Sequence, residues 1–244
     1  MDFDIILDRV SEGLVGVDSN TTRVNTSTKG HVYLPGLPTL YEPQCAEELM
    51  IWWKTTYPRD FQNLNYIETS FPYPNNNRNM CDIVFSTDGI WPSANTNDLP
   101  EWAIELKKIV FVGDNGKNND YGPSKFISPF LKDRSLAHDV IKLQEATISR
   151  KKAVIGYGFN YDLLTLAQAT QRFPQYSDRI KNAIDVCKRA GMPNNDLNMN
   201  YLLDIADFII QKQNVTGELR TREFKNAWKH PLGGNGIVFG WEIQ

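Results

Sequence analysis

Glu105 and Lys107 stand two residues apart in the segment EWAIELKKIVF, residues 101–111. Apolar residues such as Ile104 and Leu106 alternate with them, and this alternation predicts a β-strand. Side chains on a strand point alternately to its two faces, so residues 105 and 107 share one face about 7 Å apart along the chain. A carboxylate and an ammonium group directed at one spot from a mainly apolar strand are suited to chemistry on a charged substrate.

A second acidic residue, Asp82, lies in the strand candidate MCDIVFS, residues 80–86, among side chains that are otherwise mostly apolar. A buried carboxylate is costly without a partner, and strands disfavour Asp. If this segment pairs with residues 101–111, Asp82 and Glu105 stand side by side and repel each other unless a cation lies between them. Mg²⁺ is bound by one or two carboxylates, with waters and phosphate oxygens completing its octahedron. The pattern therefore fits phosphodiester hydrolysis, in which Lys107 adds positive charge or helps to position the attacking water.

The elements that must position these residues follow one another in the order of a mixed α/β domain. We expect a short helix near residues 3–12 followed by a loop or hairpin, and a second helix in LYEPQCAEELMIWWKTTYP. The remaining elements are strands at 64–71, 80–86 and 101–112, a helix within 134–149, a strand at 152–159, helices at 162–173, 178–190 and 199–213, and a closing strand, GIVFGWEI. A strand, a helix and a strand in succession form a crossover unit, which predicts that strand 152–159 runs parallel to a neighbour in the sheet.

Composition limits the class of protein. The 244 residues are 41% hydrophobic, enough for one domain with a sizeable core, and the net charge of −3 excludes a protein coated with nucleic-acid-binding charge while leaving room for a local basic face. The start, MDFDIILDRV, is acidic where a secretion signal would be basic, and no apolar stretch approaches 18 residues. The three cysteines, Cys45, Cys81 and Cys187, are an odd number far apart and fit reduced thiols. We therefore expect a cytoplasmic protein that does not enter a membrane.

Glu42 is a further candidate for the acidic site. On a helical wheel it lies close to the centre of the side shared by Cys45, Ala46 and Leu49. A carboxylate on such an apolar side is unexpected unless it has a function. A capping function near the helix start explains Glu42 equally well. Glu48 and Glu68 are the alternatives.

Basic residues gather in residues 211–230, with aromatic Trp228 and His230 nearby. The positively charged residues are Lys212, Arg220, Arg222, Lys225 and Lys229, against Glu218 and Glu223. Either this stretch contacts phosphate or reads bases, or it is an exposed helix surface.

The helix within 134–149 has a polar face with Arg134, His138 and Lys142. This face lies either near the site or along the DNA backbone, or it is a solvated helix face.

At its acidic residues the sequence resembles the PD-(D/E)XK nuclease superfamily, whose core is an Asp on one strand and Glu-x-Lys on the next. The matching residues are Asp82, then Glu105 and Lys107 with a leucine between them. The order of elements over roughly residues 40–160 is similar too: a helix with an acidic residue, a meander that carries the motif, then a helix and a further strand. Cys81 stands where the name-giving Pro would be, a position that the family tolerates losing.

This resemblance implies a single nuclease domain over residues 1–244. Its α/β fold would be a restriction-endonuclease-like mixed β-sheet flanked by helices, with a helical C-terminal elaboration over about 162–230 and the closing strand. Asp82, Glu105 and Glu42 would bind Mg²⁺, for which Mn²⁺ can substitute, and Lys107 would complete the catalytic set. Double-stranded DNA is the implied partner, and a sequence-specific type II-like restriction or other defence endonuclease, commonly a homodimer, is the implied protein.

Two other functions remain open. One is a repair, recombination or nicking nuclease of the same superfamily, which substrate preference would distinguish. The other is a non-catalytic DNA-binding or interaction protein with this fold, against which the intact Asp, Glu and Lys set argues.

Overall fold

The computed structural model describes most of the chain. The described residues are 1–62, 67–74, 76–91, 98–116, 128, 135–189, 199–215 and 217–243, without the side chains of 76–78, 187–189 and 201. The side chain of Cys187, the residue Arg134 and much of the predicted polar loop after residue 116 therefore lie outside the described part.

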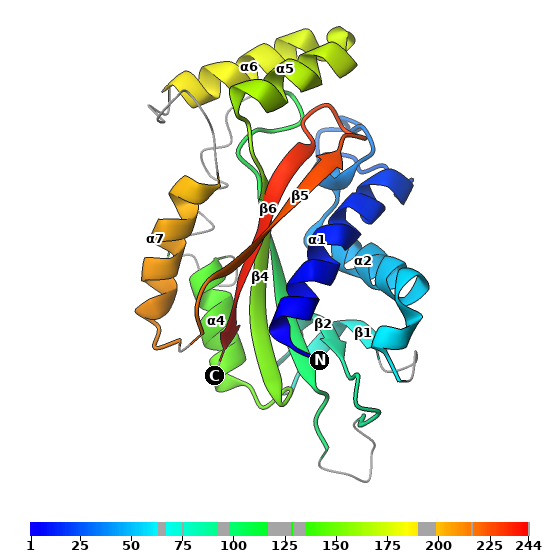
Figure 1. The fold of residues 1–244 in the computed structure, drawn as a ribbon, viewed down its shortest axis with the longest axis vertical. Coiled ribbons are helices and arrows are strands. Elements are labelled where there is room, and N and C mark those ends of the chain that lie inside the picture. Colours follow the sequence, from blue (N-terminus) through cyan, green and yellow to red (C-terminus); the bar gives the residue numbers. More distant parts are fainter. Residues whose placement is uncertain are drawn as a thin grey trace.

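A mixed six-stranded sheet forms the centre of the protein (Figure 1), with the strand order β1-β2-β3-β4-β6-β5. Its strands are β1 (Ile67–Tyr73), β2 (Asn76–Phe85), β3 (Trp102–Ile109), β4 (Lys151–Phe159), β5 (Arg220–Ala227) and β6 (Gly234–Ile243). β3 and β4 are parallel, and the other neighbouring pairs are antiparallel. The α/β class, the antiparallel meander and the parallel crossover expected from the sequence are thereby confirmed.

Helices cover both faces of this sheet (Figure 1). On one face lie α1 (Phe3–Asn20) and α2 (Glu42–Thr56), and on the other lie α4 (Leu136–Glu145) and α7 (Asn200–Gln211). A further pair, α5 (Leu163–Arg172) and α6 (Ser177–Arg189), sits at one end of the sheet. In the described part of the chain, no helix combines the length and apolar character needed to cross a bilayer.

Aromatic packing holds α2 against the meander. The Trp53 ring of α2 meets Phe85 of β2 edge-on at a centroid distance of 5.6 Å and Phe61 at 5.4 Å. Trp53 and Phe85 are fully buried. Edge-to-face pairs of this kind stabilise a core by more than their buried area alone. The first turn of α2, which carries Glu42, is thereby placed at a defined position beside β3.

The structure corrects two predicted elements. The first helix runs to Asn20 rather than ending near residue 12, because its apolar stripe continues through Leu14 and Val17, which are buried against the sheet and α2. The predicted helical C-terminal elaboration is wrong for its last part, because residues 220–227 form strand β5. Only Phe224 and Ala227 are buried in that strand, so its sequence lacks the apolar alternation that marks a strand.

Asp114 ties the loop after β3 to distant parts of the chain. Its buried carboxylate hydrogen-bonds to His230 and to His31, the latter at 2.9 Å, and pairs with Arg179 of α6 at 3.3 Å. Burial alone would raise the pKa of Asp114, but the hydrogen bonds from the two histidines outweigh burial and lower this pKa to about 2. The folded protein thus binds this proton less tightly than the unfolded chain, whose Asp pKa is about 3.9.

The lowered pKa of Asp114 predicts a specific pH dependence of stability. The contribution of Asp114 should be complete above about pH 4 and should be lost as the pH falls towards about 2. Asp114→Asn should lower the free energy of unfolding at pH 7 by about 2 kcal/mol, typical of hydrogen bonds to a charged group. Urea unfolding at several pH values measures both effects. The exposed Asp178→Asn is the control, and equal acid sensitivity of wild type and Asp114→Asn between pH 4 and 2 would contradict the assignment.

Candidate active site

Strands β2 and β3 stop pairing with each other at the centre of the candidate site. Their paired register covers only Phe85 to Ile83 of β2 against Trp102 to Ile104 of β3, although both strands continue beyond this segment. The backbone N–H groups of β3 that follow therefore need acceptors other than a β2 carbonyl.

Two carboxylates supply those acceptors. Asp82 Oδ2 accepts the N–H of Leu106 at 2.7 Å, and Glu42 Oε1 accepts the N–H of Lys108 at 3.0 Å. Glu42 reaches β3 from the start of α2, where Pro43 also fits the first helical turn. The separation of the strands thus directs one side chain from β2 and one from α2 to the same stretch of β3.

Successive side chains of β3 point to opposite faces of the sheet, as the alternation predicts. Lys108 points towards the segment before α2, where its ammonium bonds to the carbonyls of Pro38, at 2.9 Å, and Leu40. Glu105 and Lys107 point to the other face, which α4 covers. The sequence-based expectation that Glu105 and Lys107 share a face is confirmed.

Glu105 has partners from two other elements. Tyr73, the last residue of β1, donates its hydroxyl to Glu105 Oε1 at 2.6 Å. The ammonium of Lys142 on α4 lies 3.1 Å from the same oxygen. Both interactions restrain one side of the Glu105 carboxylate, which is 3% exposed as a residue.

Lys107 is held between two acids. Its Nζ lies 2.9 Å from Asp139 Oδ2 on α4 and 3.4 Å from Glu42 Oε2. Asp139 also pairs with Lys142, at 2.8 Å, and so bridges two lysines. α4 is oriented for this role by Ser135, whose hydroxyl accepts the N–H of His138 at the helix start.

The pKa values of the Asp82 and Glu105 carboxyl groups are raised, because nearby positive charge does not offset burial and repulsion. Burial raises the pKa of Asp82 well above its usual value, and repulsion from Glu105 raises it further. Burial and repulsion from Asp139 raise the pKa of Glu105, despite the opposing effects of Lys142 and Tyr73. A cation placed between these two groups would favour their ionised forms.

For Lys107 and Lys142, the attraction of nearby acids outweighs the effect of burial on the pKa. Burial would lower the pKa of Lys107, but the charges of Asp139 and Glu42 outweigh burial and raise this pKa above its usual value. Glu105 and Asp139 likewise raise the pKa of Lys142 against burial. Both side chains are therefore cations at neutral pH.

Asp82 and Glu105 fit a hard divalent cation. Within the described part of the chain, the hydrogen bonds to these carboxylates go to Oδ2 of Asp82 and Oε1 of Glu105. No three His, Cys, Asp or Glu side chains of the described part are grouped to hold a metal. Mg²⁺ usually takes one or two protein carboxylates, the number that Asp82 and Glu105 would supply. A ligand role for Glu42, which here contacts Lys107 and Lys108, stays a prediction.

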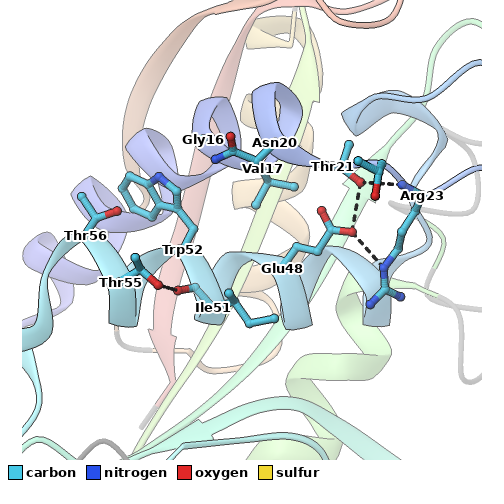
Figure 2. A pocket seen from close by; sticks show the side chains of 11 residues that line it. Gly16, Val17, Asn20, Thr21, Arg23, Glu48, Ile51, Trp52, Thr55 and Thr56 are labelled. Atoms are coloured by element: carbon cyan, nitrogen blue, oxygen red, sulfur yellow. Dashed lines mark hydrogen bonds and ion pairs between the residues drawn. The ribbon is translucent and has the colours of Figure 1, made fainter.

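The alternatives to Glu42 lie elsewhere. Glu48 points away from β3 into a pocket of about 390 Å³ between α1 and α2, where it accepts the hydroxyl of Thr21 at 3.0 Å and pairs with Arg23 at 2.8 Å (Figure 2). Glu68 is exposed on β1, opposite Val84 of β2. Of the three acids, Glu42 is the one that contacts Lys107.

The predicted DNA-contacting residues are not brought to this site. β5 lies three strand spacings from β3, about 14 Å. Each of the four predicted cations, three on β5 and Lys229 after it, has a nearby acceptor. Arg220 pairs with Asp4, Arg222 with Asp4 and Asp8, and Lys225 with Glu223, while Lys229 bonds to the carbonyls of Ser19 and Thr21. Their contact with DNA stays a prediction.

Sequence reasoning missed two residues of the cluster, Asp139 and Tyr73. Asp139 carried a detectable signal, because it lies three residues after Leu136 and four before Leu143, on the buried stripe of its helix. An acid on such a stripe is 1% exposed here. Tyr73 carried no comparable signal, since its position beside Glu105 depends on strand pairing.

No protein-family model matches this chain, and comparisons with curated proteins and with solved structures gave no significant match. The geometry of the carboxylate and lysine cluster is therefore what indicates the chemistry of this protein.

The bridging position of Asp139 predicts a large effect on stability. Asp139→Ala leaves the ammonium groups of Lys107 and Lys142 close together and without their shared acid, so the free energy of unfolding should fall by about 3 kcal/mol or more. Chemical denaturation measures this loss. Asp178→Ala, which removes an exposed acid paired with Lys181 on α6, is the matched control and should change stability little. Equal stability of the two variants would show that Asp139 does not bridge the lysines.

Proposed function

We propose that this protein is a Mg²⁺-dependent endodeoxyribonuclease of the PD-(D/E)XK type, most similar in role to a type II restriction or other defence nuclease. The observation that carries the proposal is the convergence of Asp82, Glu105 and Lys107 where β2 and β3 separate, with Glu42 beside them. The order of elements supports it, since a meander carrying the motif is followed by α4 and the parallel strand β4. On this proposal the mixed sheet is a restriction-endonuclease-like fold.

Asp82 and Glu105 are the groups that would hold the metal. Bound Mg²⁺ polarises a phosphoryl group and lowers the pKa of a coordinated water. Asp82 is fixed through its bond to the Leu106 N–H, and Glu105 through its bond from Tyr73, so both carboxylates are oriented before a ligand arrives. Orientation of this kind reduces the entropy lost on binding.

The raised pKa of Lys107 argues against a role as general base and agrees with added positive charge or with positioning of the attacking water. A lysine that stays protonated at neutral pH cannot take a proton from water. Its ammonium can instead stabilise the negative charge that develops on the phosphate oxygens. Asp139 and Glu42 hold Nζ in place for that role.

Cleavage of plasmid DNA tests the proposal. Purified protein should cut methylated or unmethylated plasmid into discrete fragments with Mg²⁺ and should be inactive with EDTA. Asp82→Ala and Lys107→Ala should each lower the cleavage rate by about 100-fold or more, as expected when a metal ligand or a charge-stabilising group is removed.

Lys181→Ala is the matched control for loss of a lysine, because Lys181 is exposed on α6 and lies outside the cluster. It should cut at the wild-type rate. Nicks in one strand would favour the repair or nicking alternative, and DNA binding without cleavage would favour a non-catalytic protein. Folded protein that neither binds nor cuts any form of DNA would overturn the proposal.

A further inference from the structure

Lys142 of α4 neutralises one of the two candidate metal ligands. Its Nζ lies 3.1 Å from Glu105 Oε1 and 2.8 Å from Asp139 Oδ1. It also lies over the Tyr73 ring, 5.6 Å from the ring centroid. The Lys142 side chain is only 17% exposed, so solvent screens these contacts weakly. An ammonium group and a divalent cation would therefore interact with the same buried carboxylate.

The charges of the cluster do not balance. Four carboxylates, those of Glu42, Asp82, Glu105 and Asp139, surround the two ammonium groups of Lys107 and Lys142. Counted over these six described groups, with all of them ionised, the cluster carries an excess of two negative charges, equal to the charge of one divalent cation. Within the described residues, Lys142 is the lysine that forms an ion pair with Glu105, whereas the ion pairs of Lys107 go to Asp139 and Glu42. The charge of Lys107 still acts on Asp82 and Glu105 without a direct contact.

We propose that Lys142 is a built-in counter-ion that competes with the divalent cation for Glu105 and thereby lowers the affinity of the site for metal. This proposal rests on the function proposed above. A cation held by Glu105 would repel the Lys142 ammonium, which lies on the Oε1 side of the same carboxylate. Asp139 would still hold this ammonium, because its Oδ1 lies 2.8 Å from Nζ.

Metal affinity in the absence of DNA tests the role of Lys142. Titration with Mn²⁺, with the free ion followed by electron paramagnetic resonance, gives a dissociation constant for the full-length protein without any reference to cleavage. Lys142→Gln removes the competing charge and keeps a polar group of similar length, so Mn²⁺ should bind at least about tenfold more tightly. Lys142→Arg keeps the charge and should bind Mn²⁺ about as wild type does. Asp82→Asn added to Lys142→Gln should reverse the gain, since it removes the second ligand.

Lys181→Gln is the matched control, because it removes an exposed positive charge from α6 and should leave the affinity unchanged. Circular dichroism establishes that each variant is folded, and Lys142→Met replaces Lys142→Gln if the latter is unfolded. An affinity of the charge-removing variant within twofold of wild type, or weaker, would overturn the counter-ion role.

The cleavage assay separates this proposal from the proposed function. Tighter Mn²⁺ binding by Lys142→Gln together with a wild type that never cuts DNA would support the counter-ion and reject the nuclease. Cleavage by wild type together with an unchanged Mn²⁺ affinity in Lys142→Gln would support the nuclease and reject the counter-ion role. Folded proteins that bind no Mn²⁺ at millimolar concentration would overturn both.

Discussion

The candidate site depends on the loss of strand pairing between β2 and β3 after Ile104. A backbone N–H group that loses its partner in a buried sheet must be satisfied by another acceptor. Here Asp82 and Glu42 serve the N–H groups of Leu106 and Lys108, so a requirement of the backbone brings two carboxylates to β3.

The helix α4 completes the cluster by balancing charge from the other face. Buried ionised groups are costly unless each is paired, and a pair that loses one member becomes strongly unfavourable. Asp139 satisfies both lysines, and Lys142 partly satisfies Glu105, which makes the position of α4 a condition for the stability of the whole group. Burial and repulsion from neighbouring acids raise the pKa values of Asp82 and Glu105, and a divalent cation between them would favour their ionised forms.

The elements with a strong local pattern could be predicted from the sequence. The strand around Glu105, the parallel crossover to β4 and the three helices between β4 and β5 were all predicted within a few residues. Strand β5 was not predicted. It is an edge strand of the described sheet, where it pairs with β6, and it buries only Phe224 and Ala227, so its neighbour rather than its own pattern forms it. Its charged side chains meet α1, a contact that no local pattern of sequence contains.

For the site, the sequence alone determined that Glu105 and Lys107 share a face, since the alternation of a strand requires it. It also marked Asp82 as an acid in a buried strand that needs a partner. Only the tertiary structure decided that Glu42 rather than Glu48 contacts Lys107, and that Asp139, Lys142 and Tyr73 join the cluster. Periodicity specifies the direction of a side chain relative to its own element, whereas meeting a side chain from another element depends on how the sheet and helices pack.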